Sequence, residues 1–229
     1  VEALERTGAD VVGGAMTPAL GAAGARAVAA AFASPFGMGG ASFRRAPTAG
    51  GPVDAVYLGA CRRDAFARFG TFDEDLVRNQ DDEWAARVRA GGGVIWLDPR
   101  VRSSYRPRRT LGAAFSQLLG YGLYKPAALA KSPGGLRWRH LAPSTWVVGM
   151  AGLGGWALVH PAAVPVFGVA AGLYAAGALA AAAAARCLSA AAVFPVMHAG
   201  YGLGFLGGLM GLERLHRARA MSGGAGAAS

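Results

Sequence analysis

Residues 140–185 read HLAPSTWVVGMAGLGGWALVHPAAVPVFGVAAGLYAAGALAAAAAA and contain no Asp, Glu, Lys or Arg. A second uncharged run separates Arg186 from Glu213. About 20 apolar residues, each rising 1.5 Å, already cross the hydrocarbon of a bilayer, so both runs are too long for ordinary core helices. We therefore expect the carboxyl-terminal third of the chain to lie in or on a membrane.

Three apolar segments are expected in this region, at residues 141–159, 162–185 and 190–212. The second is the clearest spanning helix. The third carries His198, Tyr201 and several glycines, and is expected either to span the bilayer or to lie in its interface. If residues 213–219 share the cytoplasmic side with the folded part, the number of spans must be even, and one segment is interfacial or re-entrant. Residues 222–229 are expected to form a disordered tail.

Charge is concentrated before the apolar region. The chain has 229 residues and a net charge of +10, and 19 of its 23 Lys and Arg residues lie in residues 1–140. Nine of these lie between Arg100 and Arg139 without an intervening acid, a position that favours anionic lipid headgroups and the cytoplasmic side. No recognised nucleic-acid motif accompanies the charge, so we expect membrane lipids and no nucleic acid as partners. Cys61 and Cys187 fall in different parts of this layout, and no disulfide is expected.

The first part of the chain alternates between strand and helix patterns, which predicts a three-layer α/β domain. Residues 34–52 are rich in Gly, Pro and Ser and contain Phe36, Phe43, Arg44 and Arg45, so we expect a long, functional loop there. The expected strands are residues 9–14, 53–59, 94–97 and 101–105, and the expected helices are residues 1–8, 21–33, 62–69, 81–90 and 111–124.

The densest polar cluster is Asn79-Gln80-Asp81-Asp82-Glu83 at the expected start of a helix. Backbone N–H groups at a helix start favour an ionised carboxylate, which suits a base that accepts a proton from a sugar hydroxyl. From composition alone, a solvated helix start that merely suits the dipole is the favoured explanation of the cluster.

Several segments, taken in order and spacing, are similar to the second half of family 2 glycosyltransferases, and most similar to the succinoglycan-type exopolysaccharide glucosyltransferases. The resemblance covers residues 9–125 and continues more loosely into the apolar segments. It implies the carboxyl-terminal half of a glycosyltransferase A-type nucleotide-sugar fold, followed by two or three membrane helices. The segments are VDAVYLGACRRDAF (53–66), FGTFDE (69–74), NQDDEWAARVRAGG (79–92), YRPR (105–108) and QLLGYGLYK (117–125).

The resemblance implies roles for individual residues. Asp81 matches the catalytic base that deprotonates the acceptor hydroxyl, and Gln80 would orient it. Glu83 and Arg87 match the following helix positions, where an ion pair four residues apart would hold the base helix in place. The family inverts the anomeric centre by direct displacement of a nucleoside diphosphate, so no covalent nucleophile is needed.

Further residues match positions near the acceptor and donor, each with a plainer alternative. For the strand end at residues 57–60, facing the acceptor and plain packing are equally good explanations. Tyr121 and Tyr124 could stack on a sugar or pack at the membrane surface, and packing is favoured. Arg106, Arg108 and Arg109 could hold a diphosphate or anchor to lipid headgroups, and anchoring is favoured. Leu123 and Tyr124 replace the family's Arg-Trp pair, which weakens any assignment as a processive polymerase. The implied substrate-binding residues are Tyr57, Gly59, Ala60, Asp82, Arg108, Gln117 and Tyr121.

The family binds Mg or Mn through an Asp-x-Asp motif. Asp73-Glu74-Asp75 has that pattern but matches the family's Gly-Gly-Phe-Asp-Glu turn, so we expect the metal ligands to precede Val1 and assign no metal ligand in this chain.

The expected division of the chain is a partial catalytic domain (1–109), a basic amphipathic juxtamembrane region (110–140), membrane or interfacial helices (141–212) and a basic tail (213–229). The expected function of the complete enzyme is inverting transfer of a sugar from a nucleotide sugar to a lipid-linked or polysaccharide acceptor at the plasma membrane, with the catalytic part cytoplasmic. This chain is expected to lack the donor and metal half and to be inactive by itself. The alternative is a non-catalytic membrane scaffold.

Overall fold

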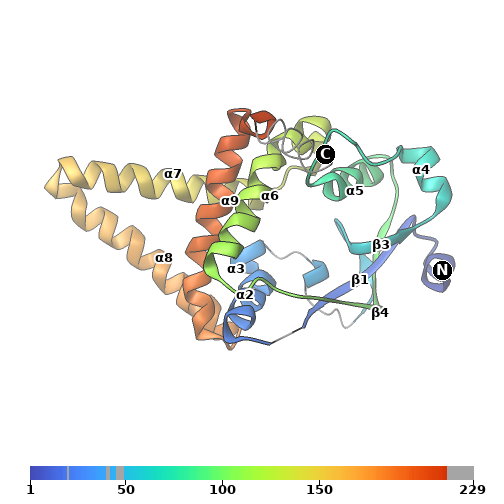
Figure 1. The fold of residues 1–229 in the computed structure, drawn as a ribbon, viewed down its shortest axis with the longest axis horizontal. Helices are drawn as coiled ribbons and strands as arrows, with labels where there is room; N and C mark the ends of the chain where they lie inside the picture. Colours follow the sequence, from blue (N-terminus) through green and yellow to red (C-terminus); the bar gives the residue numbers. More distant parts are fainter. Residues whose placement is uncertain (20, 40–41, 45–48, 216–229) are drawn as a thin grey trace, which may run out of the picture.

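The computed structural model describes residues 1–19, 21–39, 42–44 and 49–215, which form a mixed α/β structure around a four-stranded sheet (Figure 1). The strands lie in the order β2-β4-β1-β3. The two central strands are parallel, with Val11 opposite Ile95, and each edge strand is antiparallel to its neighbour. Residues 11–16 are buried because β1 lies inside the sheet. The strand bounds are Val11–Pro18 (β1), Gly51–Pro52 (β2), Tyr57–Cys61 (β3) and Ile95–Tyr105 (β4).

Two expected strands prove to be one. Residues 94–97 and 101–105 join in β4, because a register shift opposite β1 between Gly13 and Ala15 accommodates Asp98 and Pro99 within a single strand. The strand expected at residues 53–59 instead begins at Tyr57, because Val53, Ala55 and Val56 pack against the hydrophobic cluster beneath the sheet.

Helices α4 (Arg63–Phe69) and α5 (Gln80–Ala90) cover one face of the sheet. Their apolar side chains share a core with the sheet, which buries Val11, Trp84, Val88 and Ile95. Helix α2 (Ala23–Ala33) does not join this core and packs instead against α6, α8 and α9. The expected three-layer domain is therefore not what the described residues form, because the apolar face of α2 is used by the helical part of the molecule.

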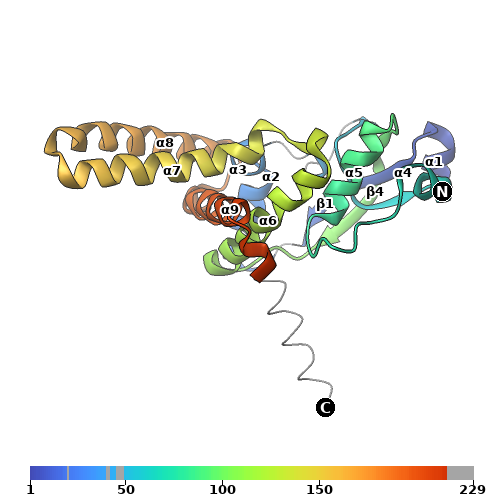
Figure 2. The same ribbon diagram turned by 90° about the horizontal axis from the view of Figure 1, so that it is seen from above.

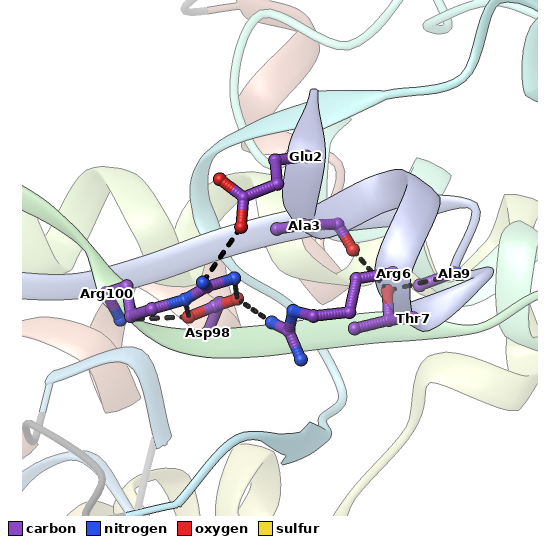
Figure 3. Close-up of polar contacts among 7 residues, drawn as sticks. All are labelled: Glu2, Ala3, Arg6, Thr7, Ala9, Asp98 and Arg100. Atoms are coloured by element: carbon purple, nitrogen blue, oxygen red, sulfur yellow. Dashed lines mark hydrogen bonds and ion pairs between the residues drawn. The ribbon is translucent and has the colours of Figure 1, made fainter.

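The amino-terminal helix α1 (Glu2–Thr7) is fixed to β4 through buried Asp98, as Figure 3 shows. Asp98 accepts hydrogen bonds from Arg6 and Arg100, and Arg100 also contacts Glu2 at 3.0 Å. Burial by itself would raise the pKa of Asp98, but the Arg100 backbone N–H and the two guanidinium groups outweigh it and lower that pKa. The ion pairs hold α1 on the sheet.

The helical part consists of α2, α3 (Pro35–Met38), α6 (Leu111–Lys131), α7 (Trp138–Val159), α8 (Val164–Ala184) and α9 (Val193–Leu209). Helix α6 begins where expected but runs seven residues further, through Pro126. The short helices α3 and Ser42–Arg44 lie in the segment expected to be a loop, and Arg45 lies outside the described residues. The same is true of the expected tail at 222–229.

Helices α6 and α9 pack backbone against backbone. A Cβ atom added to Gly204 of α9 would lie 2.2 Å from the Leu119 carbonyl oxygen, and one added to Gly208 would lie 2.3 Å from that of Leu123. From the other side, a Cβ on Gly122 of α6 would lie 2.2 Å from the Tyr201 carbonyl oxygen. Small residues spaced by four let two helices approach this closely. We call this contact the glycine seam.

Two helices of the described part are long and apolar enough to cross a bilayer, Pro161–Ala184 and Leu188–Leu209. They differ in packing, because 11% of the first and 50% of the second is buried inside the protein. Figures 1 and 2 show α7 and α8 extending together away from the sheet, with α9 and α6 across their base. Helix α7, expected as a third apolar segment, is not among the two.

Candidate active site

A cavity of about 1020 Å³ lies where the sheet meets α5, α6 and α9. It brings together side chains far apart in the sequence, including seven of the nine residues implied as catalytic or substrate-binding. These are Tyr57, Gln80, Asp81, Asp82, Arg108, Gln117 and Tyr121.

The start of α5 is fixed in the cavity wall by Asn79. This residue has a left-handed backbone with φ of 63°, and its side-chain amide donates a 3.0 Å hydrogen bond to the Tyr121 carbonyl oxygen of α6. Asn is one of the few residues that adopts this conformation readily. The turn places Gln80, Asp81 and Asp82 in the first turn of α5, where the helix dipole favours negative charge.

The two neighbouring aspartates have different surroundings. Asp82 forms an ion pair with Lys125 of α6, whose ammonium group is almost completely buried. Asp81 is exposed to the cavity side and forms no ion pair with any described residue; its carboxylate accepts a 2.9 Å hydrogen bond from the Asp82 backbone N–H. Of the two carboxylates, Asp81 is therefore the one left without an ion pair, while Asp82 is paired with a cation.

A chain of hydrogen bonds orders the opposite wall. Arg108 donates to the Gln117 side-chain carbonyl at 3.2 Å, and the Gln117 amide donates to the Tyr121 hydroxyl at 2.9 Å. Gln117 and Tyr121 lie one turn apart on α6, so both face the cavity. The arrangement leaves the guanidinium of Arg108 with further donors for a ligand.

Gly59 and Ala60 do not line the cavity. They follow Tyr57 on the edge strand β3, where both are exposed, and only Tyr57 is in the cavity wall. The space beside Gly59 is filled by Val56 and Val11, because a Cβ there would lie 2.7 and 2.9 Å from their side chains. In this structure neither residue contributes to the cavity wall.

Glu83 and Arg87 lie behind the cavity wall. The buried Glu83 carboxylate accepts a 2.7 Å hydrogen bond from Arg87 Nε and a 2.9 Å bond from the Ser132 hydroxyl at the end of α6. Arg87 also donates to the carbonyl oxygens of Phe69 and Thr71 at 2.6 and 2.7 Å. The pair thus ties α5 to the preceding turn and to α6, which keeps the first turn of α5 in place.

Other cavity residues had no role assigned from sequence. His140, in the first turn of α7, lines the cavity, and burial reinforced by the charge of Lys125 lowers the pKa of His140 to about 4. Met197, His198 and Tyr201 of α9 also line it, and Arg44 enters from the segment between α3 and β2. In the sequence, these residues were marked only by the glycines of the apolar segment and the arginines of the Gly- and Pro-rich segment. Sequence reasoning could not place them in one cavity, because their convergence depends on how the helices pack.

The described residues offer no ligand set for Mg or Mn, since they contain no group of three or more His, Cys, Asp or Glu residues suited to a metal ion. Asp73 and Asp75, which have the spacing of a metal motif, both contact the Lys131 ammonium group, at 2.6 and 3.3 Å. The hydrogen bond from Lys131 lowers the pKa of Asp73. These two carboxylates therefore join the turn at residues 73–75 to the end of α6.

Comparison of the chain with protein-family models, with curated proteins and with solved structures found no match. The cavity and the sequence motifs that line it are therefore the features from which a function can be inferred.

Proposed function

We propose that this chain forms the acceptor side of a membrane-attached, inverting glycosyltransferase of family 2. The observation that supports it is the cavity, which gathers seven residues implied by the sequence motifs from β3, α5, α6 and the segment before α6. The reaction would move a sugar from a nucleoside diphosphate sugar to a lipid-linked or polysaccharide acceptor, and the fold would be the acceptor part of a glycosyltransferase A-type fold.

Asp81 would act as the base. As the acceptor hydroxyl oxygen bonds to the anomeric carbon, its proton passes to the Asp81 carboxylate, and the bond from that carbon to the diphosphate breaks with its electron pair leaving on the diphosphate. Gln80 would orient the hydroxyl. Because Lys125 neutralises Asp82, a single free carboxylate would face the hydroxyl. No step is assigned to Mg or Mn, because the described residues do not fit either ion.

The same proposal places the chain in the plasma membrane as a multi-pass protein. The poorly buried helix Pro161–Ala184 would cross the bilayer. Since α7 and α8 extend together from the body, they would enter and return on one side (Figure 2). Arg137 and Arg139 at the base of α7 favour the cytoplasmic side, where nucleotide sugars are found.

Replacement of Asp81 tests this function. In membranes that contain the full-length protein and labelled nucleotide sugars, Asp81→Asn should abolish transfer to the acceptor while nucleotide-sugar binding persists. Asp64→Asn is the matched control, because Asp64 is an exposed aspartate in the first turn of α4 and does not line the cavity. Transfer by Asp81→Asn at the control's rate would remove Asp81 from the role of base.

The alternative of a non-catalytic membrane scaffold is supported by the exposed surface of α7 and α8. Apolar side chains such as Trp156, Leu158 and Leu173 are exposed there. A scaffold would show no transfer with any nucleotide sugar, and its cellular role would survive Asp81→Asn but not deletion of the α7–α8 pair.

A further inference from the structure

Arg44 is a half-buried cation in the cavity wall. Its guanidinium carbon lies 4.9 Å from the ring centre of Phe32, 5.4 Å from that of Phe43 and 5.9 Å from that of Tyr105. Aromatic faces attract a cation at these distances, and they also hold the flat guanidinium in one orientation. The three rings therefore fix where Arg44 can direct its N–H groups.

No Asp or Glu side chain compensates this charge. All 13 Asp and Glu residues lie in the described part of the sequence, and none forms an ion pair with Arg44. Its buried Nε atom also has no hydrogen-bond partner among the described residues. Burial accordingly lowers the pKa of Arg44 below its usual value, against the smaller opposing effect of Tyr105. Burying an unpaired charge is costly, which is expected where a ligand supplies the missing anion.

The cavity as a whole is lined by more cations than acids. Among the described residues, it is lined by two acids, Asp81 and Asp82, and by six cations. Two of the six are already paired, Lys125 with Asp82 and Arg139 with Asp54. Arg106 follows Tyr105 directly at the end of β4, and Arg108 is two residues further. The six cations are Arg44, Arg78, Arg106, Arg108, Lys125 and Arg139.

We propose that Arg44, with Arg106 and Arg108, binds a phosphate or diphosphate group of the ligand that enters the cavity. Guanidinium groups match phosphate oxygens with paired, charge-assisted hydrogen bonds, and the aromatic rings around Arg44 would hold its donors in position before the ligand arrives. The proposal rests on the proposed function only in using the same cavity, and it specifies that function by making the bound ligand a phosphate ester.

Binding of inorganic pyrophosphate tests the proposal. The whole chain is purified in an uncharged maltoside detergent, and binding is followed by calorimetry and by the rise in Tm on adding pyrophosphate. Arg44→Met should weaken binding roughly 10- to 100-fold, as expected for the loss of charge-assisted hydrogen bonds. Arg44→Lys should weaken pyrophosphate binding by an intermediate factor, because lysine keeps the positive charge but lacks the paired N–H donors of the guanidinium. Arg63→Met is the matched control, since Arg63 is an exposed arginine on α4 outside the cavity.

Stability without ligand separates binding from a structural role. If Arg44 only supported the fold, Arg44→Met should lower the ligand-free Tm. If its charge is uncompensated, as proposed, Arg44→Met should leave the ligand-free Tm unchanged or raise it. Equal pyrophosphate binding by wild type and Arg44→Met, or a lower ligand-free Tm in Arg44→Met with an unchanged pyrophosphate shift, would overturn the proposal.

Two further comparisons identify the source of the phosphate and keep the two proposals separate. If phosphatidylglycerol nanodiscs raise Tm in an Arg44-dependent way and pyrophosphate does not, the phosphate belongs to a lipid headgroup; the reverse result assigns it to a soluble or ligand-borne diphosphate. Asp81→Asn should retain pyrophosphate binding. Arg44-dependent binding without any sugar transfer by the full-length protein would support the anion site and contradict the glycosyltransferase.

Discussion

The glycine seam predicts that one methyl group at Gly204 separates α6 from α9. The added Cβ would lie 2.2 Å from the Leu119 carbonyl oxygen, 2.9 Å from Leu123 N and 3.0 Å from the Leu119 carbonyl carbon. All three atoms belong to the backbone, so no side chain can rotate out of the way. The helices must therefore move apart by roughly 1 Å to restore ordinary contact.

The cost follows from this displacement. Overpacking of a close contact is unfavourable by about 1–3 kcal/mol, whereas replacing Gly by Ala inside a helix is favourable by about 0.8–1 kcal/mol. Gly172→Ala on α8 isolates the second effect, because nothing lies within 4 Å of a Cβ there. The difference between the two variants should therefore be about 1–3 kcal/mol in the free energy of unfolding. For a chain of 229 residues this corresponds to roughly 2–12 °C in Tm.

The assay is thermal unfolding of wild type, Gly204→Ala and Gly172→Ala in the same detergent, followed by circular dichroism. Pyrophosphate binding is measured in parallel, because α6 and α9 both contribute cavity residues. Gly204→Ala should melt well below Gly172→Ala. If the two variants melt together at or above the wild-type temperature, the close backbone packing inferred for the seam is refuted.

Three other predictions concern groups around the cavity. His140 has a pKa of about 4 in the folded chain against about 6.5 when unfolded. The stability that it contributes should therefore be full above pH 6.5 and fall as the pH drops to 4. His140→Asn should flatten a plot of Tm against pH between these values, and an unchanged slope would contradict the prediction. Glu83→Gln should lower the free energy of unfolding by about 3 kcal/mol because it leaves Arg87 without its carboxylate; urea unfolding checks this against Glu74→Gln, an exposed control. Burial would raise the pKa of Asp54, but Arg137, Arg89 and Arg139 outweigh it and lower that pKa. The stability that the Asp54 carboxylate contributes should therefore be lost only below about pH 4. Asp54→Asn should make the fall of Tm at low pH shallower in a plot of Tm against pH.

Helices and their ends were predictable where a local signal exists. Acids at the start of α5 and glycines after it mark that helix in sequence, and the structure begins it one residue earlier, at Gln80. The joining of two strands in β4 was not predictable from Asp98 and Pro99, because the register shift that accommodates them depends on pairing with β1. The sequence pattern of a segment predicts its own secondary structure, whereas the pairing of a strand depends on a partner strand that is distant in sequence.

The cavity likewise combines residues marked by a local sequence pattern with residues whose position depends on packing between distant segments. Its residues on α5, α6 and β3 belong to motifs that the sequence displays, but the contribution of α9 arises only because glycines bring it against α6. Arg44 was visible only as part of a Gly- and Pro-rich segment, and its lack of a carboxylate partner needs the positions of all the acids. The helices long and apolar enough to cross a bilayer were predictable in number only approximately, since α7 and α8 are similar in length but α7 is less apolar.

The glycine seam also bears on how such a cavity evolves. Because main-chain atoms set the separation of α6 and α9, it does not depend on the size of the side chains that these helices present to the cavity. Single substitutions at positions such as Gln117, Tyr121 or Met197 can then change which ligands fit without altering the spacing of the two helices. Descendants of one ancestral chain can diverge in ligand preference by small steps, while the glycines themselves stay constrained.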